Sequence, residues 1–110
     1  MRVPNADKAI VDIRKLTDYC LNYGHPRGKH KARVFQSALG VTTIHAGEVR
    51  EALLQKVKTV DCDEGVVDEY GSRYVVDFSY ARGVKKAILR STWIVKTGEE
   101  VPRLTSCFVL

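Results

Sequence analysis

Residues 73–96, RYVVDFSYARGVKKAILRSTWIVK, are rich in β-branched and aromatic side chains and contain a single turn signal, Arg82-Gly83. This texture is typical of two strands joined as a hairpin. It continues on both sides, so the sequence predicts four strands, at about 60–70, 73–80, 85–96 and 103–109. The connections at 71–72, 82–83 and 97–100 are short. Neighbouring strands should therefore pair antiparallel as a meander.

The chain before residue 60 shows helical spacing instead. Three helices are expected, at about 12–22, 29–39 and 47–58. The second should end at Gly40 in a C-cap position. Its inward stripe is predicted to be Val34, Phe35 and Ala38, with Lys31 on the edge of that stripe. Helices followed by strands predict an α+β fold, with about three N-terminal helices packed on one face of a four-stranded antiparallel sheet.

Length and composition set the class of protein. A chain of 110 residues with 45% hydrophobic and 28% charged residues is expected to form one soluble domain spanning residues 1–110. The three cysteines are too few and too scattered to suggest a disulfide framework or a thiolate zinc site, and no signal peptide or membrane span is recognisable. We therefore expect a cytoplasmic protein without a metal or cofactor.

The net charge of +5 is concentrated in two runs that contain no acid. The first extends from Tyr23 to Gln36 and also contains His25 and His30; its cations, Arg27, Lys29, Lys31 and Arg33, all lie at residues 27–33. The second, residues 82–96, holds Arg82, Lys85, Lys86, Arg90 and Lys96. If the runs meet in space they form one positive site for phosphates, and if they do not they are two ordinary solvated faces.

The segment His25-Pro-Arg-Gly-Lys-His-Lys-Ala-Arg33 is the densest group of chemically useful side chains. Imidazole can take up and return a proton near neutral pH, and the cations can neutralise a phosphate in a transition state. A ribonuclease that works without metal needs this set of groups. The alternative is an ordinary His-Pro loop followed by a solvated helix start.

The third strand offers a second group. Alternation places Ser91 and Trp93 on one face and Arg90 on the other, so a hydroxyl and a stacking ring lie side by side. The alternative is that Trp93 is a core residue and Ser91 a small polar filler. Arg90 and Ser91 can share a cleft only if a bulge intervenes. On the last strand, Ser106 could bind a phosphate oxygen.

Several motifs together resemble a known family. They are Lys15-Leu-Thr-Asp-Tyr-Cys-Leu-Asn22, His25-Pro-x-Gly-x-x-Lys31-Ala-x-x-Phe35, Tyr70-Gly71, Tyr74-Val-Val, Ser91-x-Trp93-Ile and Pro102-Arg-Leu104. They resemble a small bacterial domain of uncharacterised function that occurs alone and at the C-termini of contact-dependent and polymorphic toxins. That domain is in turn similar to the barnase/EndoU/colicin/RelE (BECR) group of ribonuclease toxins.

The resemblance implies a metal-independent endoribonuclease that cleaves RNA, with tRNA as one candidate, by attack of the ribose 2′-OH. His25, Lys31, Ser91, Trp93 and Ser106 would be its catalytic residues. Arg27, Lys29, His30, Arg33 and Arg90 would bind phosphate, and His30 is a second acid–base candidate. A cognate antitoxin or immunity protein is the expected partner. The alternative is a non-catalytic RNA- or protein-binding module of a toxin–antitoxin or defence locus.

Overall fold

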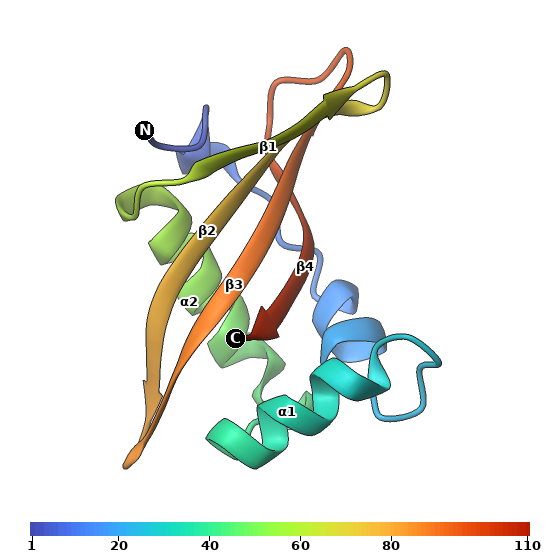
Figure 1. Ribbon diagram of the computed structural model, residues 1–110, viewed down its shortest axis with the longest axis vertical. Coiled ribbons are helices and arrows are strands. Elements are labelled where there is room, and N and C mark those ends of the chain that lie inside the picture. The colour runs from blue at the N-terminus through green and yellow to red at the C-terminus, as the bar shows by residue number, and fades with distance from the viewer.

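The strands form a single antiparallel sheet in the order β1-β2-β3-β4, as Figure 1 shows for the computed structural model, which describes residues 1–110. Their bounds are Asp63–Asp68 for β1, Gly71–Arg82 for β2, Lys85–Lys96 for β3 and Arg103–Val109 for β4. The predicted meander and the bounds of β3 and β4 are confirmed. Gly71 was expected in a turn but begins β2, where an added Cβ would overlap the backbone of Val95.

The helical elements all precede the sheet. They are η1 (Ala6–Lys8), η2 (Leu16–Cys20), α1 (Lys29–Leu39), η3 (Thr43–His45) and α2 (Ala46–Thr59). The predicted α1 is confirmed, including Gly40, which takes the left-handed conformation and donates to the carbonyl of Gln36 at 2.9 Å. The α+β class is confirmed as well. No helix here has both the length and the apolar character needed to cross a bilayer.

The helix expected at 12–22 is wrong in length and type. Only a π-helical turn, η2, forms there, closed by a 2.9 Å hydrogen bond from the Leu21 N–H to the Leu16 carbonyl. The wider turn brings Leu16, Cys20 and Leu21 to the same side, and all three are buried. In a regular α-helix Leu16 and Cys20 would also share a face, but Leu21 would lie about 140° from Leu16, so the wider turn is what adds Leu21 to the buried side.

The predicted inward stripe of α1 is partly wrong. Ala32, Phe35 and Leu39 are the buried residues, whereas Val34 is 43% exposed. Adjacent helical positions differ by about 100°, so Val34 points well away from the face that contains Phe35. Val34 is therefore free to line a surface hollow.

The core lies between the helices and one face of the sheet. Helix α2 packs against β2, α1 against β3 and β4, and η2 against β4. Figure 1 shows α1 and the blue η2 beside the end of β4, where the chain also ends. The pairing of β3 with β4 shifts after Thr92, which leaves Thr105 as the extra residue of a bulge. Pairing is regular at Arg90 and Ser91, so these two side chains stay on opposite faces.

Candidate active site

A charged cleft of about 640 Å³ opens where η2, the loop that precedes α1 and strand β4 come together. Its lining residues are Asp12, Arg14, Lys15, Asp18, Tyr19, His25, Arg27 and Thr105. Seven of them lie within residues 12–27 and Thr105 comes from β4, which η2 packs against. The cleft therefore exists only in the folded chain.

His25 closes the turn that leads into α1. Its Nδ1 accepts hydrogen bonds from the backbone N–H groups of Arg27 and Gly28, at 3.0 and 2.9 Å. Its carbonyl accepts from the N–H of Lys29 at 2.9 Å. Because a backbone N–H can only donate, Nδ1 must offer its lone pair, and the neutral ring carries its proton on Nε2. In this geometry His25 stabilises the turn before α1 and presents an N–H donor.

Tyr19 joins His25 to Lys31. The rings of Tyr19 and His25 meet edge to face with centroids 4.9 Å apart, and Lys31 Nζ donates to the Tyr19 hydroxyl at 3.0 Å. Gly28 makes this approach possible, since a Cβ there would overlap the carbonyl oxygen of Tyr19. The structure thus brings the predicted His25 and Lys31 to the two sides of one phenol ring.

Sequence reasoning missed Tyr19 as a site residue. It lies within a quoted motif of the family resemblance, but the 12–22 segment was expected only to form a helix, and no role was assigned to Tyr19. The π-helical turn of η2 and the contact with Gly28 direct the ring toward His25. The available signal was a tyrosine shortly before the His-Pro-x-Gly loop, which is weak without the fold.

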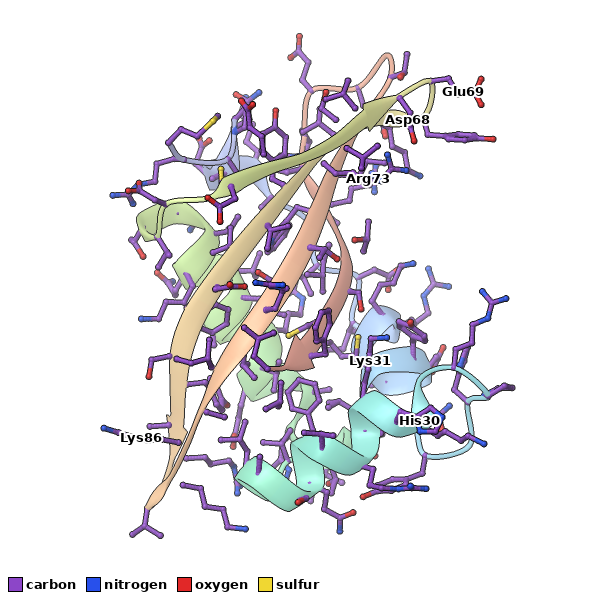
Figure 2. All side chains as sticks on the ribbon, in the orientation of Figure 1. His30, Lys31, Asp68, Glu69, Arg73 and Lys86 are labelled. Carbon is purple, nitrogen blue, oxygen red and sulfur yellow. The ribbon has the colours of Figure 1, made fainter.

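The cations of residues 27–33 lack carboxylate partners. No salt bridge includes Arg27, Lys29, Lys31 or Arg33; the arginines that form salt bridges are Arg2, Arg14, Arg73, Arg82, Arg90 and Arg103. Figure 2 shows His30 and Lys31 side by side at the start of α1. Unpaired positive charge at the start of a helix favours a bound anion.

An ion pair between Asp12 and Arg14 lies in the same cleft. Arg14 Nη2 contacts Asp12 Oδ2 at 2.8 Å, and this hydrogen bond is the main reason that the pKa of Asp12 falls to about 2. Asp12 and Arg14 therefore largely cancel each other's charge. Lys15 and Arg27 remain as unpaired cations in the lining.

Ser91 and Trp93 do not reach the cleft. Both are buried on the inner face of β3, where Ser91 Oγ donates to the Val76 carbonyl at 2.8 Å. Trp93 Nε1 donates to Ser91 Oγ at 2.9 Å. The hydroxyl and the indole satisfy each other inside the core, so neither contacts solvent. Their positions agree with the alternative in which Trp93 is a core residue and Ser91 a small polar filler. Neither face of the indole ring is open for stacking.

Arg90 also lies outside the cleft. It projects from the other face of β3 and makes a two-point pair with Asp77, at 2.8 Å for each contact. The Arg90 hydrogen bonds lower the pKa of the Asp77 carboxyl. The second basic run therefore does not join the first. Figure 2 shows Lys86 near the tip of the β2–β3 hairpin, apart from His30 and Lys31.

Ser106 lies on β4, next to the bulged Thr105. Its Oγ is buried and has no hydrogen-bond partner. The nearby Cys107 N–H donates to Cys20 Sγ at 3.3 Å. Burial raises the pKa of the Cys20 and Cys107 thiols, which disfavours the thiolate that a nucleophile would need.

A second, smaller hollow adjoins the first on the far side of Lys31. It has a volume of about 240 Å³ and is lined by His30, Lys31, Val34, Phe108 and Val109. His30 makes no side-chain hydrogen bond, so both of its ring nitrogens are accessible to a ligand. No group of three or more His, Cys, Asp or Glu side chains is arranged to hold a metal ion.

Comparisons with known proteins place the chain in a class. Residues 2–110 match the family described as Domain of unknown function (DUF6883), and the chain belongs to that family. A chain of the contact-dependent growth inhibition toxin–immunity protein complex from Klebsiella pneumoniae 342 has the same fold. The match has a TM-score of 0.68 and 19% sequence identity, and it covers 92% of this chain and 99% of the other. No curated protein matches the chain.

Proposed function

We propose that this protein is a toxin-type domain that binds RNA at residues 27–33 and cleaves it without a metal ion. The observation that carries the proposal is the charged cleft, where Tyr19 contacts both His25, which lines the cleft, and Lys31, which borders it, beside cations that have no carboxylate partner. A chain of the same fold occurs in a toxin–immunity complex, which supports the toxin part of the proposal. The proposed inhibitor is an immunity protein or antitoxin with an acidic surface that covers these cations.

The reaction is attack of a ribose 2′-oxygen on the adjacent phosphorus. A base removes the 2′ proton as the new P–O bond forms, and an acid supplies a proton to the 5′ oxygen as its bond to phosphorus breaks. The products are a 2′,3′-cyclic phosphate and a 5′-hydroxyl. The protein must therefore supply a base, an acid and positive charge for the phosphate.

The hydrogen bonds distribute these roles. His25 donates its Nε2–H to a phosphate oxygen, because its Nδ1 lone pair is already occupied. His30 is the base, since its imidazole is unbonded and free to accept a proton. Lys31 supplies the charge. The Tyr19 hydroxyl, whose oxygen accepts from Lys31, has its own proton available for the leaving oxygen.

Asparagine substitutions distinguish the roles of His25 and His30. Total tRNA is incubated with wild type, His30→Asn, His25→Asn and His25→Ala in EDTA, and the new ends are mapped. His30→Asn should lower the cleavage rate by about 10²–10⁴ while RNA affinity is kept. His25→Asn should retain most activity, because an amide can accept these backbone hydrogen bonds through Oδ1 and donate to phosphate through Nδ2. His25→Ala should lose about 1 kcal/mol of stability with those hydrogen bonds.

Three results would contradict this assignment. An inactive but folded His25→Asn beside an active His30→Asn would return proton transfer to His25. Products with 5′-phosphate ends would exclude attack by the 2′-OH. Cleavage that depends on an added metal ion would exclude the metal-independent reaction.

The second candidate is a module that binds RNA or a protein partner and does no chemistry. The observation in its favour is that Ser91, Trp93 and His25 Nδ1 all make hydrogen bonds within the protein. RNA binding that weakens steeply with salt, without cleavage in any variant, would support an RNA-binding module. Neither binding nor cleavage would favour the protein partner.

A further inference from the structure

We propose that the smaller hollow, lined by His30, Lys31, Val34, Phe108 and Val109, is a subsite for one unpaired nucleobase of the RNA. The inference rests on the proposed function and adds where the chain holds a base. The hollow is about 240 Å³, below the roughly 300–1,000 Å³ of sites that enclose drug-sized ligands. It suits a single flat ring system better than a whole nucleotide.

Lys31 marks the boundary between the two hollows. Its Nζ lies 5.0 Å from the centroid of the Tyr19 ring and 5.5 Å from that of the Phe108 ring. Tyr19 belongs to the charged cleft, and Phe108 belongs to the smaller, more apolar hollow. An ammonium group therefore separates a charged compartment from an aromatic one. This arrangement matches a nucleotide, with the phosphate on one side of Lys31 and the base on the other.

Of the three apolar walls of the hollow, only Val109 packs against the core. Neither Phe108 nor Val34 belongs to the cluster of buried hydrophobic side chains or packs against it. A half-exposed phenylalanine beside unpaired cations is the combination that single-stranded nucleic acids use, because every base has a face that stacks. The cation next to it, Lys31, has no carboxylate partner that would compete with phosphate.

The test is a set of short single-stranded RNAs whose riboses are 2′-O-methylated, so that the 2′-oxygen cannot attack. In each RNA one position in turn is abasic, which removes a base and leaves every phosphate. Wild type should show one position at which the missing base weakens binding by about 5- to 150-fold, equivalent to about 1–3 kcal/mol per stacked base. Phe108→Leu should bind the intact RNA more weakly and lose that difference.

Controls separate the ring from general effects. Tyr70→Leu removes an exposed aromatic ring from the turn between β1 and β2 and should bind both RNAs like wild type. Lys31→Met should weaken binding to intact and abasic RNAs alike. Val34→Ser, at an exposed helix position, should reduce the difference without affecting folding.

Cleavage of tRNA by the same variants distinguishes the subsite from the proposed reaction. A base-dependent difference that vanishes in Phe108→Leu supports the subsite even if no variant cleaves RNA. An equal loss in wild type and Phe108→Leu overturns the subsite, even if wild type cleaves RNA. The subsite is also overturned if all abasic RNAs bind like the intact one, a result that would leave the hollow to an apolar side chain of a protein partner.

Discussion

The two basic runs have similar compositions but differ in whether their cations have carboxylate partners. In the run at residues 82–96, Arg82 lies 3.4 Å from Glu48 and Arg90 lies 2.8 Å from Asp77. In the run at residues 27–33 no cation has a carboxylate partner. A count of charges treats the two runs as equivalent. The fold pairs Arg82 and Arg90 with carboxylates and leaves Lys85, Lys86 and Lys96 without such partners, whereas every cation at 27–33 is free for an anion.

Backbone geometry explains the difference. A strand rises about 3.3 Å per residue, so the cations of β3 are distributed along the whole hairpin, and pairing with β2 puts Asp77 opposite Arg90. A helix rises only about 1.5 Å per residue, which concentrates the charges of the first α1 turns. No other strand or helix brings an acid against them.

Replacing one cation from each run gives the largest expected contrast. Lys31→Met should lower RNA cleavage by about 10²–10³, because it removes the charge nearest the phosphate. Arg90→Met should leave cleavage unchanged and alter stability only slightly, because its pair with Asp77 is partly exposed to solvent. Single-turnover cleavage and thermal unfolding measure the two effects. Equal losses of cleavage would mean that both runs bind the substrate.

Substitutions at two glycines test whether RNA binding at residues 27–33 depends on the packing of the preceding loop against Tyr19. Gly28→Ala should lower stability by about 1–3 kcal/mol and reduce RNA binding, because the new methyl group meets the Tyr19 carbonyl. Gly47→Ala is the matched control, since nothing lies within 4 Å of its Cβ and helical alanine should raise stability by about 0.5–1 kcal/mol. Denaturant unfolding compares them. A neutral Gly28→Ala would show that the loop does not need this contact.

The smallest expected effect is the pH dependence of the contribution that the Asp77–Arg90 pair makes to folding stability. The folded pKa of Asp77 is lowered by Arg90, so its contribution is present above the unfolded value of 3.8 and disappears as pH falls through the lower folded value. Asp77→Asn should cost less than about 1 kcal/mol at neutral pH, and the difference from wild type should shrink in acid. Unfolding curves between pH 7 and pH 2 test this. A difference that grows in acid would contradict the ion pair.

Much of the fold could be predicted because it depends on local signals. The bounds of α1, β3 and β4 follow from periodicity and from breakers such as Gly40. The 12–22 segment could not be predicted in the same way, because its π-helical turn is a response to packing against β4. The spacing of apolar residues within 12–22 gives no information about a contact with β4.

The sequence predicted which residue types the site contains, but not the role of each side chain. The spacing of residues 25–33 indicated a loop, a helix start and a set of groups suited to phosphate chemistry. Which nitrogen of His25 is free depends on two backbone N–H groups, and the orientation of Tyr19 depends on a glycine nine residues later. Ser91 and Trp93 were assigned to the site because they are adjacent on one strand face, whereas the twist and pairing of the sheet bury them together.

Charge, hydrophobic periodicity and turn residues along the chain are enough to specify helices, strands and their order, because those properties act between near neighbours. The joining of Tyr19, His25 and Lys31, and the separation of the two basic runs, come from folding. They depend on which surfaces meet across long stretches of chain, and that depends on packing all the elements at once around one core.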